Sequence, residues 1–324
     1  ALYRPGPMDH IETFISAKHG KTTVKYLDPI LKDILDETYG VIVYQDQVLE
    51  IVRAMAGYSL GQADIVRKAM GKKIASVMAQ EREQFLKGAE SNGFSNQLAT
   101  QVFALIEPFA GYAFNKAHSV SYAVIAYWTA YFKANYSVEY LTALLSSHIG
   151  VNERIAVAVR ECLHMNIAVL PPDINRSNVE FTIERGNDGV QSIRFGLKAI
   201  KNVGEGAVNA LIKSRDNHEE FDSLEELCRN ADLSGFNRRA LESLIKVGAL
   251  DGFGDRGSLL ASVSRILSLA QKESRLQYSG QTAMFELMGD GLKEPLSQIE
   301  LSIGEEVSGR EKMAWERELL GVSL

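Results

Sequence analysis

Helical periodicity constrains this chain more than any other feature of its sequence. From residue 27 to about residue 165, apolar residues recur at steps of three and four, the spacing that lines one face of an α-helix. The stretch "LDPILKDILDETYG" stops at Gly40, and "QDQVLEIVRAMAG" stops at Gly57. Glycine commonly follows the last turn of a helix. The sequence therefore predicts a mainly α-helical protein.

Two further helices are expected in the same part of the chain. Ser59 and Gln62 have the spacing of a capping box and predict a helix that runs through "QADIVRKAMGKK" and on toward "FLKGAE". An aromatic-rich segment, 122–140, predicts another helix. Its apolar run "AVIAYWTAYF" (123–132) is too short to span a bilayer, so we expect a buried helix here.

The pattern changes near residue 169. Two β-rich pieces, "VEFTIE" and "QSIRFGL", are joined by "RGNDG" and predict a hairpin. Helical periodicity resumes from Ala199 to about Ala270. The segment from 279 onward is rich in Gly and Ser and predicts an extended stretch, and the last residues read as a new helix followed by the start of a strand.

Composition excludes several classes of protein. A net charge of −6 argues against a uniformly basic nucleic-acid coat, although a local basic surface fits within it. The two cysteines, Cys162 and Cys228, have no CxxC spacing, so neither a disulfide framework nor a zinc site is expected. The opening "ALYRPGPMDH" has no signal-peptide pattern and no initiator Met. We expect a soluble, cytoplasmic piece of a longer protein, with no membrane partner.

A basic helix is the first candidate site. The stretch "IVRKAMGKK" (65–73) places four cations beside one acid, Asp64; these cations are Arg67, Lys68, Lys72 and Lys73. Lys68 and Lys72 lie about 40° apart on a helix and so share a face. Clustered cations predict a binding edge for a triphosphate or a strand backbone. The alternative is a solvated lysine face.

A polar trio in an aromatic run is the second candidate. The segment "GYAFNKAHSVSY" (111–122) contains Asn115, Lys116 and His118. Together they supply an amide, a cation and an imidazole beside aromatic faces, a combination that suits a nucleotide. The alternative is that these residues cap the aromatic helix and bond neighbouring backbone, and the residues leave both interpretations open.

Two helical hairpins form the third candidate. In "LKAIKNVGEGAVNALIKSR" (197–215), a glycine-containing turn exposes N–H groups at the start of the next helix, where they can hold a DNA phosphate without reading bases. A second version is "RRALESLIKVGALDGFG" (238–254). Lysines and Arg215 add positive charge. The alternative is two ordinary helical hairpins. The expected DNA-binding residues are Lys201, Val203, Gly204, Gly206, Lys246 and Gly248.

The fourth candidate is "QTAMF" (281–285), in which Gln281, Met284 and Phe285 have the spacing of a short docking motif. Catalytic and metal-binding residues are not expected in this chain, because phosphoryl-transfer chemistry needs carboxylates that converge on two ions. Asp173 in "PPDIN" stands alone, and Glu37 lies on an amphipathic helix with a solvated acidic face. No Ser-His-Asp, GxxxxGK[ST] or GxGxxG arrangement occurs.

Six motifs in order resemble the C family of bacterial replicative DNA polymerases, the DNA polymerase III alpha subunits. They are "ALYRPGPMD", "VIVYQDQVL", "AGYSLGQADIVRKAMGKK", "FAGYAFNKAHSVSYA", "VLPPDINRS" and "IRFGLKAIKNVGEGA". The resemblance implies a multi-helical fingers domain followed by a small β-hairpin and a tandem helix-hairpin-helix region. The implied ranges are 1–190 for the fingers, with the extended segment from 169; 191–270 for the hairpins; 271–294 for a segment that binds the sliding clamp; and 295–324 for the lead-in to a missing OB-fold domain.

The resemblance also implies roles for single residues. Arg67 and Lys68 match a basic pair, usually two arginines, that reaches the incoming triphosphate; a lysine there loses bidentate geometry. The trio at 115–118 matches an FNKSH motif that faces the nucleotide pocket, with Ala117 in place of Ser. Asn202 stands where Gly is common, and Asn tolerates left-handed backbone, so the turn should survive.

In this family the primer 3′-hydroxyl attacks the α-phosphate of a dNTP through two Mg²⁺ ions, which are held by a palm domain outside this chain. The resemblance thus implies a fragment that is inactive alone. It would bind the dNTP, primer–template DNA, the sliding clamp and other holoenzyme subunits. The alternative functions are a non-catalytic helix-hairpin-helix DNA-binding or repair module, and a scaffold that uses only the clamp motif.

Overall fold

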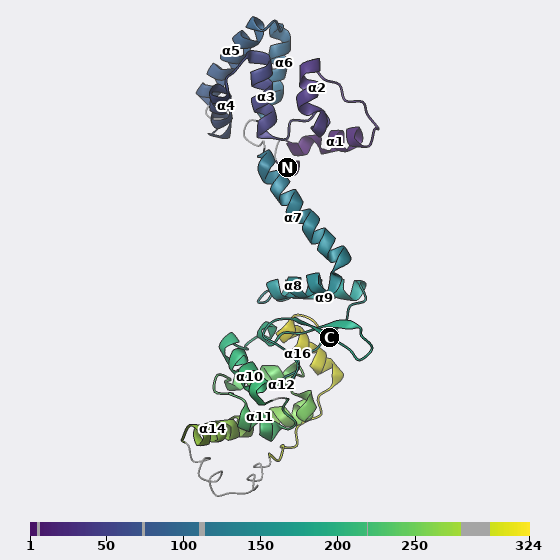
Figure 1. Cartoon of the computed structure of the whole chain (residues 1–324), viewed down its shortest axis with the longest axis vertical. Coiled ribbons are helices and arrows are strands. Elements are labelled where there is room, and N and C mark those ends of the chain that lie inside the picture. The colour runs from purple at the N-terminus through teal and green to yellow at the C-terminus, as the bar shows by residue number, and fades with distance from the viewer. Residues whose placement is uncertain (5–6, 73–74, 110–113, 219, 280–298) are drawn as a thin grey trace. The chain divides into compact units, whose positions relative to one another are not determined.

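The computed structural model describes residues 1–4, 7–72, 75–109, 114–218, 220–279 and 299–324. They divide into two compact units, Ala1–Trp128 (the N-terminal unit) and Thr129–Leu324 (the C-terminal unit). Helices dominate both units and one small sheet accompanies them, which confirms the predicted mainly α fold (Figure 1). The predicted functional boundary near residue 190 is a different division and stays a prediction.

Helices α2 to α6 build the core of the N-terminal unit. The elements of this unit are η1 (Pro7–His10), α1 (Ile11–Lys18), α2 (Pro29–Leu35), η2 (Asp36–Thr38), α3 (Gln45–Ala56), α4 (Leu60–Lys72), α5 (Ala75–Ser91), α6 (Asn96–Ile106) and η3 (Glu107–Phe109). The predicted helix end at Gly57 is confirmed, because α3 ends at Ala56 and Gly57 has a left-handed φ of +71°. The helix predicted to reach Gly40 ends earlier, since α2 stops at Leu35 and the 3₁₀ turn η2 follows it. The capping box is also confirmed, because the Ser59 N–H donates to Gln62 Oε1 at 2.9 Å and the Gln62 N–H donates back to Ser59 Oγ at 3.3 Å.

The single helix predicted from Ser59 toward residue 90 is instead two helices, α4 and α5, which pack against each other and against α3. Gly71 weakens the end of α4. Helix α5, packed against α4 and α3, buries Phe85 in the core. Gly88 permits this packing, since a Cβ there would lie 2.5 Å from the Ala56 carbonyl oxygen. Periodicity continues across the break and so did not reveal it.

The aromatic helix departs from prediction in both bounds and burial. It forms α7 (Lys116–Asn135), and α8 (Ser137–Ser147) follows directly. Its large side chains are exposed rather than buried: Tyr127 is 67% and Trp128 is 56% accessible. Apolar residues surround the whole circumference of α7, and none of them belongs to the core of either unit. Among the described residues, no helix is long and apolar enough to cross a membrane.

The C-terminal unit combines helices with a three-stranded sheet. Its elements after α8 are α9 (Asn152–His164), β1 (Val169–Leu170), β2 (Thr182–Arg185), β3 (Gln191–Arg194), η4 (Leu197–Ala199), α10 (Glu205–His218), α11 (Leu224–Asn230), α12 (Arg238–Lys246), η5 (Asp251–Phe253), α13 (Arg256–Ala261), α14 (Val263–Ser279) and α16 (Gly309–Leu320). The sheet order is β1-β3-β2. The antiparallel β2–β3 pair confirms the predicted hairpin; β1, parallel to β3, was not predicted.

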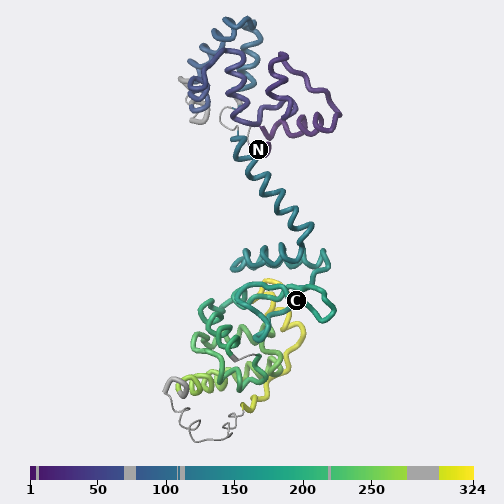
Figure 2. The backbone as a smooth tube through the Cα atoms, viewed as in Figure 1, coloured from purple at the N-terminus to yellow at the C-terminus, as the bar shows by residue number. Residues whose placement is uncertain are grey.

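The predicted terminal helix is confirmed as α16, and it belongs to the core of the C-terminal unit. Leu319 and Leu320 are buried in the same core as Leu244 and Ile245 of α12. The backbone trace shows this end of the chain, in yellow, beside the green helices of the same unit (Figure 2). Residues 295–324 were expected as a lead-in to a further domain; the described part of that segment completes this one.

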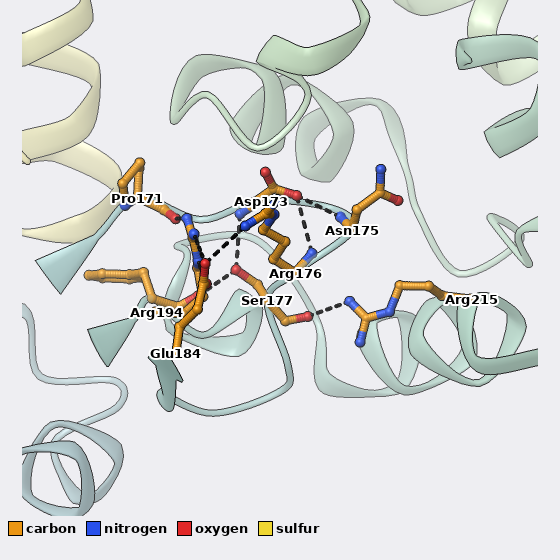
Figure 3. Close-up of polar contacts among 9 residues, drawn as sticks. Pro171, Asp173, Asn175, Arg176, Ser177, Glu184, Arg194 and Arg215 are labelled. Atoms are coloured by element: carbon orange, nitrogen blue, oxygen red, sulfur yellow. Dashed lines mark hydrogen bonds and ion pairs between the residues drawn. The ribbon is translucent and has the colours of Figure 1, made fainter. Parts of the chain in front are cut away.

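Two buried arginines hold the loop that follows the double proline (Figure 3). Arg194, on β3, pairs with Glu184 and donates to the Pro171 carbonyl at 2.8 Å. Arg215, on α10, donates to the carbonyl oxygens of Ser177 at 2.7 Å and Ile174 at 3.3 Å. Arg215 is only 9% exposed. The prediction that Arg215 adds positive charge to a DNA-facing surface is therefore wrong, because its guanidinium donates to backbone carbonyl oxygens inside the fold.

Replacing Arg215 by Met should lower the free energy of unfolding by roughly 2–4 kcal/mol, since buried carbonyl oxygens would lose their donors. Urea denaturation of the 324-residue chain measures this loss. Lys213→Met, an exposed change on the same helix, serves as the control and should stay within about 0.5 kcal/mol of the parent. Equal losses in the two variants would contradict the internal role of Arg215.

Candidate nucleotide and DNA interface

A hydrogen-bonded turn fixes the start of α3 in the N-terminal unit. Gln47 Oε1 accepts from the Val43 N–H at 2.9 Å and the Tyr44 N–H at 3.0 Å, while its Nε2 donates to Thr38 Oγ1 at 2.7 Å. The same strand-like segment bridges to Phe114, whose N–H donates to the Val43 carbonyl at 3.0 Å. The polar trio that follows Phe114 is thereby held beside the N-terminus of α3.

All three members of the trio have partners inside the chain. Asn115 Oδ1 accepts from the His118 N–H at 2.9 Å, which is the contact of a helix N-cap, at the start of α7. The Lys116 N–H donates to Asp46 Oδ2 at 3.2 Å. The His118 ring lies 5.4 Å from the Phe114 ring and 4.6 Å from the Tyr122 ring. The capping alternative thus describes the contact of Asn115, and the nucleotide roles of the trio stay predictions.

The Lys116 ammonium forms an ion pair with a carboxylate distant in sequence. Its Nζ donates to both oxygens of Glu37, at 2.6 and 2.8 Å. This hydrogen-bonded carboxylate raises the pKa of Lys116 above its ordinary value. Both side chains are nearly half exposed, 43% and 47%. An exposed pair contributes only about 0–1 kcal/mol, so this contact adds little to the stability of the fold.

Two cations of α4, Arg67 and Lys68, share one acid. Arg67 lies 2.7 Å and Lys68 2.8 Å from opposite oxygens of Asp64, and hydrogen bonds from Lys68 and Arg67 lower the pKa of that carboxyl. Lys72 ends α4, but its side chain is outside the described residues. Helix α4 packs on α3, whose first turn contacts Lys116. Within the described ranges, no hydrogen bond or ion pair joins α4 to Lys116 itself.

The first hairpin turn is open to solvent. Asn202 has a φ of +72°, which confirms the predicted left-handed turn. The element before the turn is one 3₁₀ turn, η4, rather than the expected helix, because Leu197 is bonded to the Asn178 carbonyl as the chain leaves β3. A Cβ on Gly204 or Gly206 would meet nothing within 4 Å. Packing does not require glycine there, and the N–H groups of the first α10 turn have no intrahelical acceptors.

The second hairpin turn is satisfied internally. Gly248 has a φ of +85°, and its N–H donates to the Ile245 carbonyl at 3.0 Å, in the manner of a helix C-cap. A Cβ on Gly248 would lie 2.2 Å from Arg256 Nη2. Arg256 is 8% exposed and pairs with Asp251 and Glu316. This turn therefore presents the Lys246 side chain rather than free backbone donors.

Comparisons with known proteins match both units. A profile of the bacterial DNA polymerase III alpha subunit finger domain matches residues 1–93, and a helix-hairpin-helix motif profile matches residues 166–259. The DNA polymerase III subunit alpha of Thermus aquaticus is 41% identical over 99% of this chain, and that of Escherichia coli K12 is 40% identical over 100% of it. The chain belongs to the bacterial DNA polymerase III alpha subunit family. It spans 26% of the length of the Thermus relative and 28% of the Escherichia one.

The finger profile ends before the polar trio, while the helix-hairpin-helix profile includes both hairpin turns and the arginine-held loop. Four residues next to the candidate sites were not predicted: Glu37, Asp46, Arg256 and Trp315. Glu37 lies 79 residues from Lys116 along the chain, so periodicity carries no signal for their pairing. The motif at 281–285 lies outside the described residues. In the described part of the chain, no group of three or more His, Cys, Asp or Glu side chains is placed to hold a metal ion.

Proposed function

We propose that this chain is the portion of a replicative DNA polymerase that holds the nucleotide and the duplex. The supporting observation is the identity of 40–41% to DNA polymerase III alpha subunits, which runs through both the finger and the hairpin segments. In the whole protein, the primer 3′-hydroxyl attacks the α-phosphate of a dNTP. The two Mg²⁺ ions that assist this step are bound by a palm domain outside this chain, so the chain alone is inactive.

The proposed fingers, residues 1–190, bind the incoming dNTP. Lys116 and the α4 cations Arg67, Lys68 and Lys72 provide positive charge for the triphosphate. The ion pair between Lys116 and Glu37 supports this role, because it is exposed and weak enough for a triphosphate to displace the carboxylate. Asn115 and His118 line the same edge at the start of α7.

In the full-length polymerase, Lys116→Ala should raise the apparent KM for dNTP about tenfold in primer extension, through loss of about 1.4 kcal/mol of binding. Glu37→Gln should lower the KM about two- to threefold, because the competing carboxylate charge is removed. In a Lys116→Ala background, Glu37→Gln should have no effect.

Glu161→Gln is the matched control, since it breaks the comparable Lys133–Glu161 pair and should leave the KM unchanged. An unaltered KM in Lys116→Ala would show that the nucleotide site is misassigned. That result would favour the alternative of a non-catalytic DNA-binding module.

The proposed helix-hairpin-helix region, residues 191–270, grips the primer–template duplex. The first turn offers backbone N–H groups to a phosphate, with Gly204 and Gly206 allowing close approach and Lys201 adding charge. Val203 is buried and anchors the turn. In the second turn the contact comes from Lys246, with Gly248 shaping the backbone.

Gly204→Val should weaken duplex binding about tenfold, equally for unrelated sequences, because the contact is to phosphate. Fluorescence anisotropy with two duplexes at several salt concentrations measures this. The added side chain meets open space, so thermal stability should not change. Gly61→Val, at an open glycine outside the hairpin region, is the control and should leave duplex binding unchanged. Unchanged affinity in Gly204→Val would remove the first turn from the DNA interface.

We propose that "QTAMF", within residues 271–294, is a docking motif that binds the sliding clamp. We assign residues 295–324 to the junction with the next domain. The protein would act in the cytoplasm together with the other holoenzyme subunits.

Replacing Met284 and Phe285 by Ala should abolish the processivity gained from the clamp and leave clamp-free extension intact. Loss of both activities would argue against a tethering role.

A further inference from the structure

Helix α16 contacts both hairpin turns of the C-terminal unit. At the first turn, the Leu319 carbonyl accepts a hydrogen bond from the Lys201 N–H at 3.0 Å. Leu319 and Leu320 are 4% and 0% exposed, within the core that the hairpins share. A buried helix end that bonds the turn backbone fixes the position of that turn, so α16 is more than a connection to the next domain.

At the second turn, α16 supplies two further contacts. Trp315 lies under Lys246, whose Nζ is 5.6 Å from the ring centroid. Glu316 accepts from Arg256 Nη1 at 3.3 Å, and the same nitrogen donates to the Lys246 carbonyl at 2.8 Å. Arg256 therefore connects the backbone of Lys246 to α16, while Trp315 contacts its side chain.

The two hairpins differ in what they can offer a phosphate. The N–H groups of Gly248 and Ala249 are bonded within the second turn, so this turn depends on its side-chain cation. Lys198, near the first turn, is paired with Glu205 at 2.8 Å. A carboxylate partner offsets the charge of a lysine, whereas an aromatic face orients an ammonium group and leaves its net charge available.

We propose that α16 is part of the DNA-holding surface, in which Trp315 positions the Lys246 ammonium to contact a phosphate of the duplex backbone. Trp315 is a positioning residue, since it acts through Lys246. The inference rests on the proposed role of the hairpins in gripping DNA. It adds a residue more than fifty positions beyond the helix-hairpin-helix match, which ends at residue 259.

The test uses the full-length polymerase and equilibrium binding to a primer–template duplex over a salt titration. Lys246→Gln should weaken binding about tenfold and reduce the slope of log affinity against log salt by about 0.9, the value for one phosphate contact. Trp315→Leu keeps an apolar side chain but removes the ring. It should weaken binding about threefold and shift the slope toward that of Lys246→Gln.

Trp315→Phe retains an aromatic face and should restore affinity. In the Lys246→Gln background, Trp315→Leu should cause no further loss. Lys272→Gln, an exposed lysine on α14, controls for the change in overall charge and should leave the slope closer to the parent value.

Two results would overturn the inference. If Trp315→Leu weakens binding equally with and without Lys246, the ring supports the fold rather than the lysine. If Lys246→Gln changes the slope but Trp315→Leu does not, the second hairpin binds phosphate without help from α16. An unchanged slope in Lys246→Gln would instead remove the DNA contact of that hairpin, which separates failure of the proposed function from failure of the inference.

Discussion

The C-terminal unit depends on the ion pairs of the buried Arg256. A buried guanidinium is costly unless every part of it is partnered. Arg256 meets this condition by pairing with Asp251 and Glu316 and by donating to the Lys246 carbonyl. Burial opposes its charge, but the hydrogen bonds to the two carboxylates hold its pKa above the ordinary value. One side chain thereby joins the second hairpin, the segment after it and α16.

Pairing of charges has a different consequence in the N-terminal unit. Lys116, Arg67 and Lys68 are all paired with acids at the surface, where such contacts contribute little and are screened by salt. The acids orient these cations, but the ion pairs are weak. The contrast with Arg256 separates charges that build the fold from charges that remain available to a ligand.

Much of the local structure could be predicted from the sequence, because it depends on neighbours in the chain. The predicted features that the structure confirms are the helix end at Gly57, the Ser59 capping box, the β2–β3 hairpin and the left-handed Asn202. Each follows from residues within a few positions of one another. Strand β1 was not predicted, because two residues are too few to show the alternation of apolar and polar residues that indicates a strand.

The errors concern features that depend on distant contacts. The burial expected for α7 failed because periodicity shows that residues are apolar and does not show what covers them. The sequence indicated that Arg215 is a surface cation. In the structure its guanidinium bonds the Ser177 carbonyl oxygen, and the two residues are some forty positions apart in sequence. For the candidate site, residue types indicated which groups could bind phosphate, whereas their present partners, Glu37 for Lys116 and Trp315 for Lys246, required the fold.

Photo-crosslinking tests the central claim most directly. The full-length polymerase, bound to a primer–template, would be irradiated with a dNTP that carries a photoreactive group on its γ-phosphate, and the adducts mapped by peptide sequencing. We expect adducts within α4 and at the start of α7, around Arg67, Lys68 and Lys116, and we expect excess unlabelled dNTP to suppress them. Adducts found exclusively outside residues 1–128 would contradict it.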